Sequence, residues 1–107
     1  PMKTKAITPH YVCPEILIGR GYGEGCDIWA LGVILFFMFC GEPPFTTLID
    51  GPKGDVDLFN KIKKGDYEFN PYNWAKISNE ARDMVKQMLT VDPSKRPSAS
   101  TRAPADP

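Results

Sequence analysis

The chain has 107 residues, of which 42% are apolar and 24% are charged, and this composition is that of one ordinary globular domain. Because 13 basic and 13 acidic residues cancel, the chain lacks the positive field that binds nucleic acid or an anionic membrane surface, and we expect neither partner. Cysteines stand at positions 13, 26 and 40 in no metal-binding spacing. We therefore expect no metal site, and reduced thiols in an intracellular protein that is cytoplasmic or nuclear.

The first 25 residues are predicted to be loop around a single helical turn. Residues 1–9 are polar and rich in threonine and proline, which favours extended structure. A short turn of helix is expected at residues 14–17, where Pro14 occupies a first-turn position that suits proline. Glycines then alternate at positions 19, 21, 23 and 25. Their spacing departs from the phosphate-binding G-x-G-x-x-G pattern, so a flexible connector is expected there.

The next segment is an uninterrupted apolar run at residues 28–40. At a rise of about 1.5 Å per residue this run is roughly 20 Å long, which is too short for the ~30 Å hydrocarbon core of a bilayer. Uniform apolarity predicts a core helix buried on all sides. Asp27 is the expected N-cap, Gly41 the expected residue after the last turn, and Pro43 and Pro44 prevent continuation.

Two shorter helices are predicted in the second half of the chain. After a loop at residues 46–56, Asp57 is expected to cap a helix that ends at Lys64 and is closed by Gly65. An irregular aromatic stretch follows at residues 66–76, which we expect to form a satellite core.

Ser78 is expected to cap the last helix. Its apolar positions form one stripe: Ala81, Met84, Val85, Met88 and Leu89. Asp92 and Pro93 stop this pattern, and residues 100–107 are predicted to be a disordered tail. Strand signals are weak throughout, so the fold is predicted to be all-α.

Four segments, in this order, resemble motifs of the protein kinase family. They are TPHYVCPE at residues 8–15, DIWALG at residues 27–32, GEPPF at residues 41–45, and the stretch at residues 73–99. Cys13 and Ala30 stand where the family usually has alanine and serine, and Arg96 matches the arginine of the last region. The resemblance is to serine/threonine kinases, with the calcium/calmodulin-dependent group and its calcium-dependent relatives nearest. It implies a mainly α piece of a kinase C-lobe over residues 1–99, from a parent domain that is α+β with two lobes.

The resemblance also implies roles for individual residues near the substrate. Thr8 would hydrogen-bond the catalytic aspartate and lysine of the parent enzyme. Pro9 and Val12 would line the pocket for the substrate residue after the phosphoacceptor. Asp27 would accept hydrogen bonds from backbone amides of the catalytic loop, which keep a buried carboxylate charged.

Three further residues have structural or regulatory roles by the same resemblance. Glu15 and Arg96 would form a buried ion pair that ties the activation segment to the C-lobe. Thr4 lies where many kinases carry a regulatory phosphothreonine, although the lysine after it disfavours a proline-directed kinase. Without the resemblance, Asp27 is simply a helix cap, Glu15 and Arg96 are surface charges, and Thr4 is an ordinary loop hydroxyl.

Phosphoryl transfer needs a glycine-rich loop, a strand lysine with its glutamate, a catalytic aspartate, and magnesium-holding asparagine and aspartate residues. None of the corresponding motifs occurs in the 107 residues. We therefore expect no catalytic residue and no bound cofactor in this chain, with ATP and Mg²⁺ belonging to the parent kinase, and we expect the chain alone to be inactive.

Two functions remain open at this point. The first is a fragment of a serine/threonine kinase whose parent phosphorylates proteins with MgATP, with a protein substrate and the missing remainder of the domain as partners. The second is a truncated kinase-like binding module or decoy without catalysis. It would act through the Pro9 and Val12 pocket and would bind a regulatory protein on the helix from Asp57 to Lys64.

Overall fold

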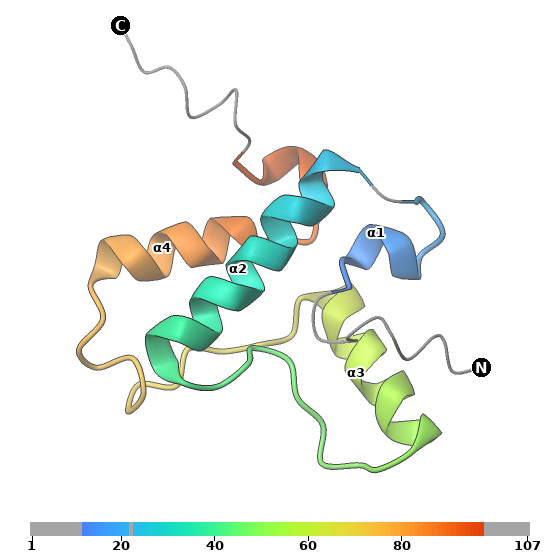
Figure 1. Cartoon of the computed structure of the whole chain (residues 1–107), viewed down its shortest axis with the longest axis horizontal. Helices are drawn as coiled ribbons and strands as arrows, with labels where there is room; N and C mark the ends of the chain where they lie inside the picture. Colours follow the sequence, from blue (N-terminus) through green and yellow to red (C-terminus); the bar gives the residue numbers. More distant parts are fainter. Residues whose placement is uncertain (1–11, 22, 98–107) are drawn as a thin grey trace, which may run out of the picture.

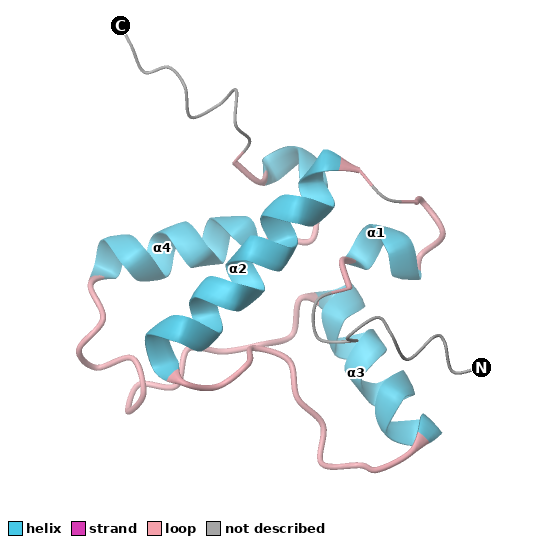
Figure 2. Cartoon of the chain, viewed as in Figure 1, coloured by secondary structure: helices cyan, strands magenta, loops and turns pink. Residues whose placement is uncertain are grey.

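The computed structural model describes residues 12–21 and 23–97, and every regular element in these ranges is helical (Figure 2). The elements are α1 (Pro14–Leu17), α2 (Glu24–Cys40), α3 (Pro52–Lys64), α4 (Asn79–Met88) and the short 3-10 helix η3 (Pro93–Lys95). The described ranges contain no strand, which confirms the predicted helical fold. Residues 98–107 lie outside these ranges, so the predicted disordered tail stays a prediction.

Helix α2 is the central element of the structure (Figure 1). Helix α4 and η3 pack against α2, and α1 packs against α3. Gly32 lies where α2 approaches the end of α4, and a Cβ atom at this position would be 2.9 Å from Cβ of Met88. The two helices can approach this closely only because Gly32 has no side chain.

The sequence prediction is wrong for the start of α2 and correct for its end. The helix begins at Glu24 with Gly23 as N-cap, so the predicted N-cap at Asp27 is wrong. The extra turn forms because distant residues hold it, as described below for Gly25 and Cys26. At the other end, Gly41 adopts a left-handed conformation (φ 86°), and its N–H donates to the Phe37 carbonyl at 2.7 Å. The predicted end of the helix is confirmed.

The apolar run of α2 is buried on one side only, which corrects the prediction of burial on all sides. Its core-facing residues, Trp29, Val33 and Phe36, are at most 3% exposed. Four large apolar side chains on α2 are instead 40–70% exposed: Leu31, Ile34, Phe37 and Met38. The described elements are too few to cover both sides of a uniformly apolar helix.

Helix α3 begins at Pro52, and its N-cap Gly51 lies six residues before the predicted cap at Asp57, so that predicted cap is also wrong. Asp57 lies within the helix and pairs with Lys61 at 3.4 Å. The early start is possible because Gly54 lies directly against the Ile49 carbonyl of the preceding loop. Gly65 ends the helix in a left-handed conformation (φ 67°), as predicted.

Replacing Gly54 with alanine should destabilise the chain, because the new Cβ atom would lie 1.9 Å from the Ile49 carbonyl oxygen and the backbone must move. We expect a loss of about 1–3 kcal/mol in the free energy of unfolding, measured by urea titration. The matched control is Lys53→Ala at the neighbouring exposed position, which should be neutral. A Gly54→Ala variant as stable as the wild type would contradict this packing.

The aromatic stretch at residues 66–76 is irregular, as predicted, but it belongs to the main core and is not a satellite cluster. Trp74 is 1% exposed, and its ring lies 5.0 Å from that of Phe36 on α2. Tyr67 and Phe69 also contact the Phe36 ring, with centroid distances of 5.9 and 5.6 Å. Phe36 therefore joins the aromatic stretch to the central helix.

Helix α4 has the predicted cap, because Oγ of Ser78 accepts a hydrogen bond from the Ala81 N–H at 3.1 Å. Val85, Met88 and Leu89 are buried against α2, whereas Met84 is 43% exposed and lies outside the core. Within residues 12–21 and 23–97, none of the helices has the length and apolarity needed to cross a bilayer.

Candidate functional site

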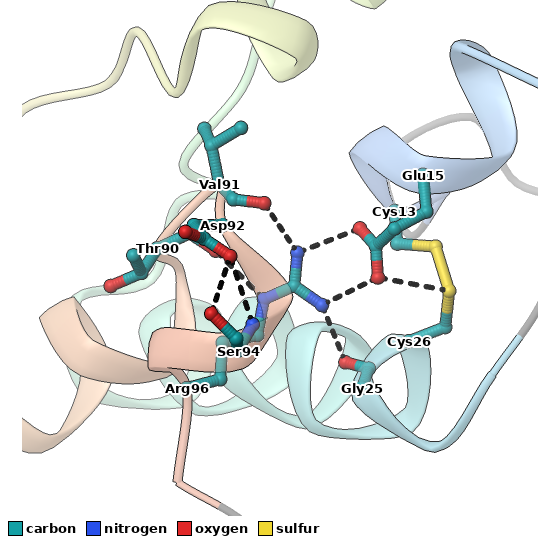
Figure 3. Close-up of polar contacts among 9 residues, drawn as sticks. All are labelled: Cys13, Glu15, Gly25, Cys26, Thr90, Val91, Asp92, Ser94 and Arg96. Carbon is teal, nitrogen blue, oxygen red and sulfur yellow. Dashed lines mark hydrogen bonds and ion pairs between the residues drawn. A yellow bond between two sulfur atoms is a disulfide. The ribbon is translucent and has the colours of Figure 1, made fainter. Parts of the chain in front are cut away.

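The side chain of Arg96 lies where α1, the first turn of α2 and η3 meet (Figure 3). It is 5% exposed, although arginine is rarely buried without a partner. Its Nη1 donates to Oε2 of Glu15 at 2.8 Å, and its Nη2 donates to Oε1 at 2.7 Å. The predicted ion pair is therefore present, in the two-pronged geometry that suits guanidinium and carboxylate.

Three backbone carbonyls accept the remaining hydrogen bonds of Arg96. Nε donates to the Thr90 carbonyl at 2.7 Å, Nη1 to Gly25 at 2.8 Å and Nη2 to Val91 at 3.1 Å. With the two bonds to Glu15, all five donors of the guanidinium are used. The contact to Gly25 explains the early start of α2, because that carbonyl belongs to its first turn.

The guanidinium group also lies over an aromatic ring. Its central carbon is 5.0 Å from the ring centroid of Trp29, which is the geometry of a cation–π contact. Trp29 is fully buried and stacks on Phe45, with a centroid distance of 5.6 Å. The polar cluster is therefore built directly onto the aromatic core.

The protonation state of Glu15 follows from these contacts. Desolvation by burial raises the pKa of this carboxyl group, but the hydrogen bonds and the positive charge of Arg96 outweigh that effect. The net result is a pKa below the ordinary value of 4.5. Glu15 is thus ionised at neutral pH and forms a charged pair with Arg96.

A disulfide joins Cys13 to Cys26 beside this ion pair (Figure 3). The expectation of reduced cysteines is therefore wrong for these two, and Cys40 is a free thiol as expected. The glycine-rich connector folds back and brings the two Cα atoms to 5.4 Å, within the range that a disulfide spans. The sequence signal for this bond was a cysteine at each end of that connector, which no general spacing rule captures.

Three potential metal ligands lie close together at the disulfide and the ion pair. One ligand atom each from Cys13, Glu15 and Cys26 lies within 4.8 Å of the others. In this structure the two sulfurs are bonded to each other, and both carboxylate oxygens accept hydrogen bonds from Arg96. The arrangement therefore does not fit a cation while the disulfide is present.

Of the other predicted site residues, the structure describes only Asp27 and Val12. Asp27 lies in the first two turns of α2 and is exposed, and Val12 is half-buried before α1. Thr4, Thr8 and Pro9 lie outside the described residues. The roles predicted for these five residues stay predictions.

Comparison with known proteins gives results that agree with each other. The sequence profile of the family described as protein kinase domain matches residues 1–104. Human serine/threonine-protein kinase DCLK3 is 50% identical over 97 residues, which are 90% of this chain and 14% of that protein. Calcium-dependent protein kinase 3 of Plasmodium yoelii yoelii is 43% identical over 99 residues, which are 92% of this chain and 17% of that protein.

A solved structure agrees with the sequence relatives. The twitchin kinase region from C. elegans matches with a TM-score of 0.74 and 25% identity, over 83% of this chain and 15% of that one. The chain spans about one seventh to one sixth of the length of the two kinases named above. Both the sequence profile and the structural match cover most of the chain, and the chain belongs to the protein kinase domain family.

Proposed function

We propose that this chain is the substrate-docking and scaffold part of the C-lobe of a serine/threonine kinase. The parent enzyme would transfer the terminal phosphoryl group of MgATP to protein serine and threonine residues. The observation that carries the proposal is the buried pair of Glu15 and Arg96, because it joins the first and last kinase-like segments of the chain. Residues 1–99 form the domain piece, in the cytoplasm or the nucleus.

Each functional side chain has a defined part in this proposal. Thr8 contacts the catalytic loop of the parent, while Pro9 and Val12 contact the protein substrate. Asp27 accepts hydrogen bonds from backbone amides of the catalytic loop, for which its exposed position on α2 is suitable. Thr4 is a candidate for regulatory phosphorylation.

The exposed apolar side of α2 supports the proposal that another part of the kinase domain packs against this helix. Leu31, Ile34 and Phe37 are 40–52% exposed, and burying such side chains typically contributes about 1.5–3 kcal/mol each. The remainder of the kinase domain is the proposed cover for this surface. It would also supply the groups that hold ATP and Mg²⁺, for which this chain has no matching motif.

The chain alone should therefore transfer no phosphate. The test is incubation of the purified 107-residue chain with MgATP and a generic serine-containing peptide, with an intact kinase as positive control. Phosphorylation of the peptide, with stoichiometric nucleotide binding to the chain, would overturn the assignment of catalysis to the remainder of the domain.

The transcript upstream of Pro1 separates the kinase fragment from the truncated binding module. An open reading frame that continues into a catalytic loop supports the kinase. An initiation codon at Met2, with no reading frame before it, supports the binding module or decoy. In that case the partner surface to test first is α3, whose residues Lys63 and Lys64 are exposed.

A further inference from the structure

The disulfide joins two segments that few other contacts hold together. Cys13 directly precedes α1, and Cys26 lies in the first turn of α2. The connector between them contains Gly19 and Gly21, both with positive φ, and a Cβ atom added at either position would meet nothing within 4 Å. The cross-link therefore closes the loop between these two residues and joins its ends covalently.

The cross-link and the ion pair act at the same point. Glu15 is two residues from Cys13, and its Oε2 lies 3.6 Å from Sγ of Cys26. Both cysteines are buried, at 1% and 3% exposure. The covalent bond thus holds the Glu15 carboxylate at the position where Arg96 binds it.

Helix α1 cannot hold this position by itself. It has four residues, and its backbone hydrogen bonds are local, such as Ile18 N–H to Pro14 and Arg20 N–H to Glu15. A helix of this length is unstable in isolation because its nucleation cost is not recovered. Its order therefore depends on three tethers: the disulfide, the ion pair with Arg96, and packing against α3.

We propose that Cys13 and Cys26 form a reversible thiol–disulfide switch that sets how firmly the α1 segment is held on α2. The proposal rests on the proposed function in one respect, the location in a reducing compartment, where disulfides are usually transient and redox-sensing. In that function the α1 segment ends the activation segment, so the switch would regulate the substrate-docking part of the kinase.

The redox step uses glutathione disulfide as the oxidant, which reaches the two buried sulfurs when the short α1 segment opens locally. Two thiols of the chain reduce one glutathione disulfide to two molecules of glutathione. The S–S bond of glutathione disulfide breaks, the bond between Cys13 and Cys26 forms, and the two thiol protons pass to the glutathione sulfurs. The reverse reaction removes one of the three tethers of the α1 segment. When Cys26 is reduced, its thiol can donate a hydrogen bond to Glu15 across the same short distance.

The experiment equilibrates the full 107-residue chain in buffers of varied glutathione to glutathione disulfide ratio. Free thiols are then alkylated and mapped by peptide mass spectrometry. Cys13 and Cys26 should change together in one two-electron transition, and Cys40→Ser should leave that transition unchanged because Cys40 is not in the bond. Hydrogen exchange is measured on the same samples, and reduction should make the amides of residues 16–20 exchange at least about tenfold faster.

Cys13→Ala gives a second measurement, since alanine is the usual residue at this place in the kinase motif. This variant should show fast exchange at residues 16–20 at every glutathione ratio. Three results would overturn the switch: thiols that stay reduced in excess glutathione disulfide, a disulfide that forms without slowing exchange, or a reduced chain that binds one Zn²⁺ and then resists oxidation. None of these readouts depends on phosphate transfer, so failure of the switch and failure of the proposed function are distinguishable.

Discussion

Replacing Arg96 with methionine should lower the free energy of unfolding by about 3–5 kcal/mol, because it leaves a buried carboxylate without its partner. Methionine has a similar volume but no donor, so Glu15 and three backbone carbonyls lose their hydrogen bonds. The measurement is urea titration followed by tryptophan fluorescence, which reports on Trp29 beneath the guanidinium group.

The comparison variant is at the half-buried pair of Lys61 and Asp57, whose side chains are 35% and 34% exposed; Lys61 Nζ also donates to the Thr46 carbonyl at 2.8 Å. Lys61→Met removes a charge in the same way but should cost less than about 1 kcal/mol, because a solvent-accessible ion pair and hydrogen bond contribute little. Equal effects of Lys61→Met and Arg96→Met would contradict the special role of the buried pair.

The pH dependence gives the same prediction an independent readout. The pKa of Glu15 is lowered in the folded chain, so the stability from its pairing is present above the ordinary value of 4.5 and is lost as pH falls below it. In Arg96→Met, burial without the cation raises the pKa of Glu15. Lowering the pH should then protonate this carboxylate and remove the unpaired buried charge. The difference in unfolding free energy between the two proteins should therefore shrink at low pH.

Trp74→Ala should have an effect of similar size, a loss of about 3–5 kcal/mol in unfolding free energy. Trp74 is 1% exposed and contacts the rings of Phe36 and Phe39 on α2 and of Phe69 on its own segment. Truncation to alanine leaves a cavity at the centre of these rings. The measurement is again urea titration, followed by circular dichroism because the variant removes a tryptophan.

Trp74→Phe distinguishes ring packing from the polar part of the indole. The Nε1–H of Trp74 is buried and has no acceptor within the described part of the chain, so its removal should cost little. We expect a loss of less than about 1.5 kcal/mol for this smaller aromatic side chain. Tyr72→Ala, at a position that is 89% exposed, should be neutral. A Trp74→Phe variant as unstable as Trp74→Ala would contradict this account.

The parts of the fold that the sequence predicted are those set by local chemistry. Gly41 and Gly65 end their helices because each reaches a left-handed conformation at low cost, and Ser78 caps α4 through its own side chain. The starts of α2 and α3 were missed because distant or preceding groups decide them. Arg96 holds the first turn of α2, and Ile49 lies against Gly54.

The features of the candidate site also divide into those that could be predicted from the sequence and those that could not. Glu15 and Arg96 are 81 residues apart, and no periodicity links them, so only the ordered resemblance to kinase motifs predicted their contact. The bond between Cys13 and Cys26 was not predicted because it depends on how the glycine connector folds, and composition carries no information about that path. Asp27 was placed on the correct helix but was given the wrong position within it.

The separation of Glu15 from Arg96 also has a consequence during protein synthesis. Arg96 is added to the growing chain 81 residues after Glu15. Until then the Glu15 carboxylate lacks this partner, and α1 can be held only by packing against α3 and, where the conditions are oxidising, by the nearby disulfide. The ion pair can therefore form only after all of the described α-helices have been synthesised.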